Sequence, residues 1–275
     1  MQIPVIESLV QGACLCLQEP DVDRKLLLID LVGNKLKDDF PVNNGNFKPP
    51  GNSRPGIPER PVLVSSNELP RRGTGSDKNR IALIHSLAHI EFNAINLALD
   101  AVVRFRDMPD KYYTDWFNIA VEEKKHFCLL RNYLNSKEHD YGDLNAHDDL
   151  WQLAEKTSHD LLLRLALVPR TMEARGLDVT PGMINKFRHI QDLDMVEILE
   201  TIYLDEIGHV NTGTFWFRFV CGRRNLDADK TFLDIVAGQL KSMPQVSINY
   251  DARSKAGFSD RELEFIGNFN EGTGG

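Results

Sequence analysis

The sequence predicts an all-α protein organised around an up-and-down four-helix bundle. Four long segments between about residues 78 and 222 carry apolar residues at helical spacing, and no run of residues is typical of a β-strand. Two of these segments also carry the pattern Glu-x-x-His in the middle of an apolar stripe. Helices with a few charged side chains on an otherwise apolar face are typical of bundles that hold a polar site in their core.

The composition is that of a folded, acidic protein. The 275 residues are 42% hydrophobic and carry a formal net charge of −8 at pH 7, which suits one sizeable domain with extra segments, or two small domains. The acidic balance argues against nucleic acid as a partner. No uninterrupted apolar stretch reaches 18 residues and the N-terminus has no basic region. We therefore expect no membrane partner, no signal peptide and a cytoplasmic location.

Four cysteines are too few for a disulfide scaffold. Cys14 and Cys16 form a C-x-C pattern that permits a metal or redox role, but we favour two thiols buried on an amphipathic helix. The chemistry of the chain is therefore sought elsewhere in the sequence.

The segments on either side of the bundle differ in character. Residues 1–38 are predicted to form an N-terminal helical segment that Pro20 divides into two short helices. Residues 39–77 are rich in Pro and Gly and cannot be helical, so we expect an extended connector packed on the bundle. Residues 223–275 are expected to be a C-terminal extension that ends in a disordered tail over residues 268–275.

The first two helices of the bundle have clear limits. The first is predicted over about residues 78–106 and ends at Met-Pro-Asp, and the second is predicted over about residues 112–136. Residues 138–145 are polar and contain a glycine, so we expect a loop there.

The third helix has the least regular pattern. It is predicted to begin near His147, Pro169 lies inside it, and residues 176–181 interrupt it with a Gly and a Pro. After a turn near residues 189–192, a fourth helix is expected over about residues 193–221. The predicted bundle therefore covers residues 78–222.

Charged residues interrupt three of the predicted inward faces. The apolar row of the first helix contains Glu91, that of the second contains Glu123 and His126, and that of the fourth contains Glu206 and His209. A buried carboxylate is costly unless it is paired or binds a metal. Residues three apart on a helix share a side, so each Glu-x-x-His directs both side chains to one point. A bundle that binds two metal ions needs this motif on two helices and one more glutamate from each of the others.

Glu173 is the predicted glutamate of the third helix. Glu91 lies 16 residues before its predicted turn and Glu123 lies 13 residues after it, so the pair lies at one level of an antiparallel hairpin. Glu173 and Glu206 lie 16 before and 14 after the second turn, and the two separations, 32 and 33 positions, match. Glu155, the alternative, lies more than one helical turn from that level. The choice of Glu173 requires the third helix to continue past Gly176, with a kink.

The ligand set suits two iron ions, with manganese or zinc as alternatives. The competing interpretation, salt-bridged core residues, is disfavoured because no Lys or Arg occupies the matching rows. Asp205 and Glu122 each precede a motif glutamate, and each is a candidate to hold the histidine of the opposing helix, the alternative being solvated charges. His85 and His89 face away from Glu91, and we expect them to be surface or interface residues.

The pattern of six ligands resembles the ferritin-like di-iron carboxylate superfamily over about residues 78–222. The stretches HSLAHIEFNAINLALD, EEKKHF, PRTMEARGLDVTP and DEIGHV look like a bacterial ferritin-like family known only as a domain of unknown function. Glu-Ala-Arg at Glu173 to Arg175, together with the Glu-x-x-His pairs, more distantly resembles the tRNA hydroxylase that oxidises the isopentenyl group of a modified adenosine. The resemblance implies a ferritin-like four-helix bundle with a metal centre that is itself the reactive group.

Three functions follow as hypotheses. The leading one is an oxygen-activating di-iron oxidoreductase, a hydroxylase or oxidase of a small-molecule or nucleoside-linked substrate, with an external electron donor. The second is a non-catalytic ferritin-like protein that binds or handles iron. The third is a tRNA-modifying hydroxylase, which the acidic net charge disfavours. The sequence leaves open the substrate, the electron donor and the oligomeric state. A homodimer is one of the candidate assemblies.

Overall fold

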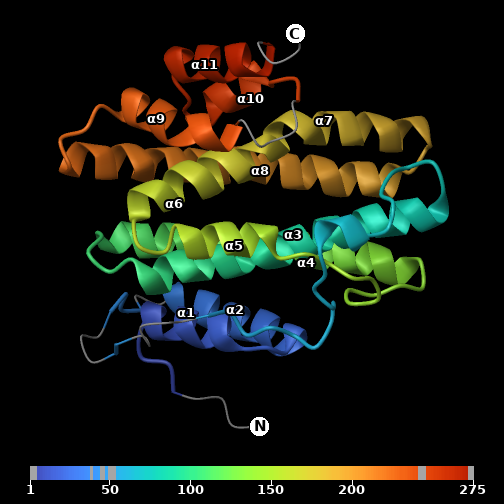
Figure 1. Ribbon diagram of the computed structural model, residues 1–275. Coiled ribbons are helices and arrows are strands. Elements are labelled where there is room, and N and C mark those ends of the chain that lie inside the picture. The colour runs from blue at the N-terminus through green and yellow to red at the C-terminus, as the bar shows by residue number, and fades with distance from the viewer. Residues whose placement is uncertain (1–4, 38–39, 44–46, 49–53, 241–245, 272–275) are drawn as a thin grey trace. The chain divides into compact units, whose positions relative to one another are not determined.

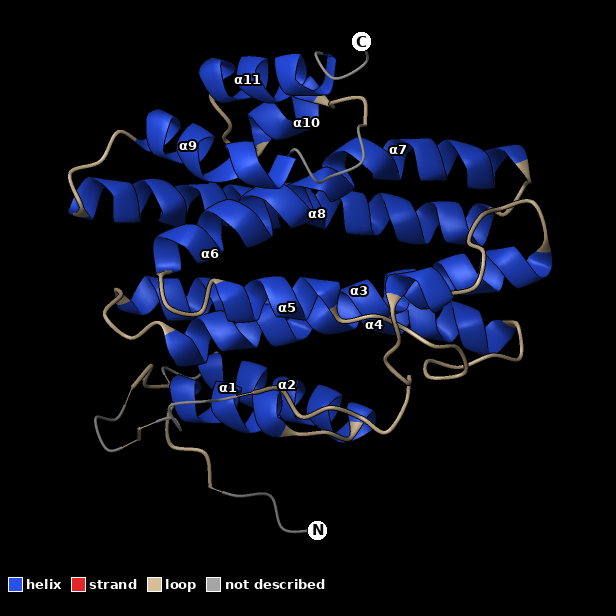
Figure 2. Ribbon diagram, viewed as in Figure 1, coloured by secondary structure: helices blue, strands red, loops and turns tan. Residues whose placement is uncertain are grey.

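Helices make up all the regular secondary structure that the computed structural model describes. It describes residues 5–37, 40–43, 47–48, 54–240 and 246–271. Figure 2 shows helices joined by loops in this part of the chain, and the sole β-type pairing there is an isolated bridge between Leu63 and Ala146. The predicted all-α class is confirmed. The finer assignment to a ferritin-like bundle is a proposal and is taken up below.

The chain divides into two compact units, Met1–Trp151 and Gln152–Gly275. Figure 1 labels the helices of both, and each unit is described here by itself. The boundary falls inside the segment that was predicted to be one bundle. The predicted division into residues 1–38, 39–77, 78–222 and 223–275 stays a prediction.

Two short helices open the first unit. Helix α1 spans Leu9–Gln18 and helix α2 spans Val22–Leu36. The side chain of Asp21 accepts a hydrogen bond of 2.8 Å from the backbone N–H of Arg24 and so caps the start of α2. Pro20 lies between the two helices, as predicted.

The described part of the connector packs on the first unit. The N–H of Gly56 donates to the carbonyl of Leu17 at 2.8 Å, and the N–H of Val64 donates to the carbonyl of Ala146 at 2.8 Å. The connector contains one short 3₁₀ turn, η1, at Ser66–Glu68. Several predicted connector residues lie outside the described residues, namely residues 39, 44–46 and 49–53 with Gly45, Pro49, Pro50 and Gly51.

Two long helices form the core of the first unit. Helix α3 spans Asp77–Arg104 and helix α4 spans Asp110–Ser136, and the two pack against each other. Both predicted helices are confirmed to within two residues at each end. By length and composition α3 resembles a membrane-spanning helix, but 78% of its most apolar stretch is buried inside the protein, as in a core helix. Residues 138–145 form the predicted loop.

The third predicted helix is a series of shorter elements. Helix α5 spans Asp149–Lys156 and helix α6 spans Leu161–Leu167. The π-helical turn η2 follows at Val168–Glu173, and helix α7 then spans Ala174–His189. Pro169 lies in the π turn, whose wider hydrogen-bonding pattern accommodates a residue without an N–H.

The predicted interruption at residues 176–181 is wrong, because α7 runs through it without a break. Pro181 has no N–H to offer the carbonyl of Leu177, its usual helical acceptor. The side-chain amide of Asn249 donates to that carbonyl at 3.2 Å instead. A residue distant in sequence thus satisfies the carbonyl that the proline leaves without its helical partner.

Helix α8, Leu193–Arg223, begins where predicted and packs along α6, η2 and α7. A Cβ atom at Gly213 of α8 would lie 2.7 Å from the Cβ of Pro169, so glycine is what allows the π turn to approach α8 this closely.

Three more helices complete the second unit: α9 at Ala228–Leu240, α10 at Tyr250–Lys255 and α11 at Asp260–Glu271. The predicted disordered tail is therefore wrong for residues 268–271, because α11 continues through them. Ile266 and Leu263 of α11 are buried and anchor this helix. Residues 272–275 of the predicted tail lie outside the described residues.

Candidate metal centre

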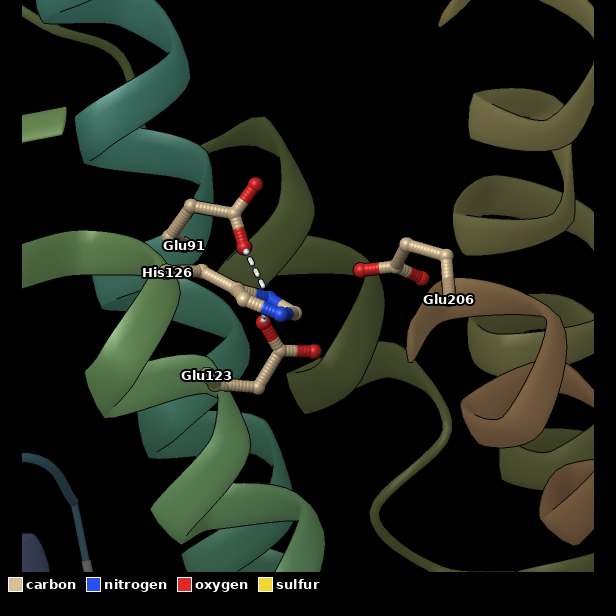
Figure 3. A group of neighbouring side chains, drawn as sticks. All are labelled: Glu91, Glu123, His126 and Glu206. Carbon is tan, nitrogen blue, oxygen red and sulfur yellow. Dashed lines mark hydrogen bonds and ion pairs between the residues drawn. The ribbon is translucent and has the colours of Figure 1, made fainter. Parts of the chain in front are cut away.

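Helices α3 and α4 bring together three of the predicted ligands. The Nδ1 atom of His126 lies 3.2 Å from Oε2 of Glu123 and 3.4 Å from Oε2 of Glu91. Figure 3 shows the two carboxyl groups on either side of the His126 ring. All three residues are buried, and each offers a ligand atom within 4.8 Å of the others. They form a buried cluster of carboxylates and imidazole, the α3–α4 cluster, that can hold a metal ion.

The electrostatics of the α3–α4 cluster favour bound positive charge. Burial, reinforced by the charge of Glu123, raises the pKa of the Glu91 carboxyl well above its ordinary value, although the His126 ring opposes the rise. Burial also opposes a charge on His126, but Glu123 and Glu91 outweigh it and raise the pKa of His126 to about 11. Both shifts favour protons held within the cluster. A bound metal ion would take the place of these protons.

Helix α8 carries the second predicted Glu-x-x-His. The Nδ1 atom of His209 lies 3.6 Å from Oε1 of Glu206, one helical turn earlier. The His209 side chain is 2% exposed and that of Glu206 is 14% exposed. The same motif therefore lies in a slightly more open setting here than on α4.

Glu173 is the last residue of the π turn, and its side chain is half-buried. Glu155, the rival, lies on α5 and is exposed. The hairpin argument required the third helix to continue past Gly176, and α7 does so. The choice between the two glutamates remains a prediction.

The predicted positioning residues differ in burial. Asp205 is half-buried and Glu122 is exposed. Their roles beside the histidines remain predictions.

Of the expected surface or interface placement of His85 and His89, the surface part is wrong. Both are buried, because the loop after α4 covers them. His85 Nε2 accepts from the N–H of Gly142 at 3.0 Å, and His89 Nδ1 lies 2.9 Å from the Tyr141 hydroxyl. Burial lowers the pKa of both histidines to about 4, so both are neutral at physiological pH. The prediction used only the angle around the helix between these histidines and Glu91. That angle carries no information about the loop that buries them.

Buried cations are the residues that sequence reasoning missed. Lys25 is fully enclosed, and its Nζ donates to the carbonyls of Cys16 and Leu17 and to Oδ1 of Asn96, at 3.0, 2.9 and 2.8 Å. Burial lowers its pKa to about 7. The lysine satisfies carbonyls at the end of α1, where a positive charge is favourable. Cys14 and Cys16 are buried, as expected, and neither forms a disulfide with another described residue.

Arg170 of the π turn is also fully buried, and Arg175 of α7 lies on the other side of Glu173 in the sequence. The sequence signal that could have found them is their position, because the two arginines flank the predicted ligand Glu173. An arginine is usually solvated, so the sequence pattern alone does not predict that Arg170 is buried.

Comparison with known proteins gives a family without an assigned activity. The family model described as "Protein of unknown function (DUF455)" matches residues 18–264. A relative from Haemophilus influenzae, described as "Uncharacterized protein", is 42% identical over an alignment of 217 positions, and the match covers 76% of this chain and 75% of the relative. No solved structure matches the chain. The match covers both Glu-x-x-His motifs and nearly all the described helices, and the chain therefore belongs to the DUF455 family of proteins of unknown function.

Proposed function

We propose that this chain is a di-iron carboxylate protein that activates oxygen, with electrons from an external donor, to hydroxylate or oxidise an organic substrate. The observation that carries the proposal is the α3–α4 cluster, in which Glu91, Glu123 and His126 are buried together. A second Glu-x-x-His on α8 repeats its chemistry. The six proposed ligands are Glu91, Glu123, His126, Glu173, Glu206 and His209.

The fold that we propose for the site is a ferritin-like four-helix bundle. Its helices are α3, α4, the α6–η2–α7 segment and α8, in up-and-down order. Two observations within the units support it. The α3–α4 hairpin presents one glutamate beside one Glu-x-x-His, and α7 packs against α8 with Glu173 at its start. A π turn within a helix is often found at a functional site.

The ligand types define the chemistry. Two iron ions held by carboxylates and imidazoles would supply a redox-active pair that can reduce dioxygen. The two histidines and four glutamates would hold the ions, and the carboxylates would balance their charge. Ile95 and Ile119 lie on the same stripes as Glu91 and Glu123 and are buried. Their side chains exclude water from the first half of the site.

The proposal is tested by loading the protein anaerobically with ferrous iron, removing the excess and then adding oxygen. We expect two iron ions per chain and oxygen consumption that follows the iron content. Glu123→Ala should lower the iron content while the helical circular dichroism signal is kept. Glu155→Ala, which removes an exposed glutamate, is the matched control and should retain both ions.

Two results would count against the proposal. Full iron loading of a His126→Ala/His209→Ala double variant would remove the di-metal interpretation. Two bound iron ions that stay ferrous in air for hours would remove the oxygen chemistry and would support the non-catalytic, iron-handling function.

A further inference from the structure

A second polar site lies within the second unit, in a cavity lined by η2, α7 and the C-terminal helices. The space open to water-sized groups amounts to about 30 Å³, and the cavity is partly open to solvent. Three guanidinium groups line it, those of Arg170, Arg175 and Arg253, together with the carboxylate of Asp178. The remaining wall is mainly apolar and includes Phe232, Val236 and Ile266.

Arg170 is held firmly but is not fully paired. Its Nη2 donates to Oε2 of Glu262 at 2.8 Å and its Nε donates to the Thr214 hydroxyl at 3.2 Å. Its guanidinium lies over the ring of Phe232, with 4.0 Å to the ring centroid. The Nη1 atom is buried and has no hydrogen-bond partner among the residues that the structure describes.

The other two arginines differ from each other. Arg253 is neutralised by Asp178, which it contacts through Nη2 at 2.6 Å and Nε at 3.0 Å. Arg175 has no ion pair within the described part of the chain, and its buried Nε has no hydrogen-bond partner there. With Glu262 included, three guanidinium groups face two carboxylates, so one positive charge is left uncompensated.

We propose that this cavity binds a small organic anion, with its carboxylate or phosphate group on Arg170 Nη1 and Arg175 Nε and its apolar part against the wall formed by α9 and α11. Guanidinium groups match the planar geometry of a carboxylate and the oxygens of a phosphate. A buried N–H without a partner costs about 1–3 kcal/mol, more when it is charged. An oxyanion would satisfy both groups and neutralise the excess charge.

A purely structural role explains only part of the arrangement. Arg170 joins the π turn to α8, α9 and α11 through Thr214, Phe232 and Glu262. That role accounts for Nε and Nη2, but among the described residues it gives no hydrogen-bond acceptor to Nη1 or to the Nε of Arg175. The inference does not depend on a bound metal, although an occupant would contact the same turn that carries Glu173.

The experiment is calorimetric titration of the metal-free full-length protein with two probes, hexanoate and inorganic phosphate. We expect saturable 1:1 binding of at least one probe. Tighter binding of hexanoate would assign a carboxylate ligand, and tighter binding of phosphate would assign a phosphorylated one. Arg175→Gln should weaken binding about 10-fold or more, because it removes a charge-assisted hydrogen bond.

Arg188→Gln is the matched control, because Arg188 lies on the same helix, is exposed and pairs with Glu200. This variant should bind like the wild type. The Nε–H resonance of Arg175, followed by NMR, should shift on titration and gives a readout that does not require a variant. Absence of binding by either probe at about 10 mM, or equal binding by the Arg175→Gln variant, would overturn the inference.

Discussion

The two Glu-x-x-His motifs have the same sequence pattern but different surroundings. On α4, Glu123 and His126 are 1% and 0% exposed and lie beside Glu91 of α3. On α8, Glu206 is 14% exposed and lies 3.6 Å from His209. The first motif is thus built into a closed cluster, and the second is more open.

The segments that pack against α4 and α8 differ in regularity. The partner of α4 is α3, one uninterrupted helix of 28 residues. The neighbouring segment of α8 contains a π turn with Pro169 and a helix with Pro181. A regular helix pair holds its side chains rigidly, whereas a π turn can change its hydrogen bonding at lower cost. We infer that the α3–α4 cluster is preformed and that the surroundings of the α8 motif can adjust.

The largest difference is expected between two alanine variants of the metal-free protein. His126→Ala leaves the carboxylates of Glu91 and Glu123 close together in a buried place, and should lower the free energy of unfolding by about 3–5 kcal/mol. His209→Ala should cost about 1–2 kcal/mol, because Glu206 remains partly exposed to water. Urea unfolding followed by circular dichroism measures both values. Equal losses of unfolding free energy in the two variants would contradict the inferred difference between the two motifs.

The close approach of the π turn to α8 can be tested at two glycines of the same helix. Gly213→Ala places a methyl group 2.7 Å from Pro169 and should destabilise the protein by about 1–3 kcal/mol. Gly208→Ala meets no atom within 4 Å and should stabilise the helix by up to about 1 kcal/mol. Thermal unfolding separates the two cases. If both variants were equally stable, the π turn would not be held against α8 at Gly213.

The buried His85 of α3 predicts that the stability of the protein depends on pH. Burial lowers the pKa of His85 to about 4 from its usual 6.5, so its contribution is complete above pH 6.5 and is lost as the pH falls toward 4. The loss should amount to about 2–3 kcal/mol. His85→Gln keeps an acceptor for Gly142 and does not titrate, so its stability should fall less over this range. His159→Gln, at an exposed position, should follow the wild-type pH curve.

The smallest expected effect concerns the proline in α7. Asn249→Ala removes the donor to the carbonyl of Leu177 together with the cap of α10, and the part of its cost that belongs to the Leu177 carbonyl should be about 1 kcal/mol. Pro181→Ala restores the helical N–H, so Asn249→Ala should cost less in that background. A double-mutant cycle by urea unfolding measures the difference. Strictly additive effects would show that Asn249 does not compensate for Pro181.

The regular helices were predictable because each buries one continuous apolar stripe. Helices α3, α4 and α8 begin or end within two residues of the predicted limits. The errors arise where a distant residue supplies what the local sequence lacks. Asn249 completes the hydrogen bonding of α7, which no pattern within residues 176–181 reveals.

The candidate site was predictable to the extent that charges interrupt apolar rows. That rule located Glu91, Glu123 and His126, which the structure brings together. It failed for His85 and His89, whose burial depends on a loop that follows α4. It also gave no signal for buried cations such as Lys25, because a lysine that satisfies the end of a helix looks in the sequence like a solvated one.

The central claim is that all six ligands hold two iron ions in one centre, and magnetic coupling between the ions tests it most directly. The protein is loaded with two equivalents of ⁵⁷Fe(II), exposed to oxygen and examined by Mössbauer spectroscopy in a strong magnetic field. The account predicts two iron ions per chain that behave as a coupled pair with no net spin, because ligands common to both ions would hold them close together. A single iron ion per chain, or two ions that respond as isolated high-spin centres, would contradict it.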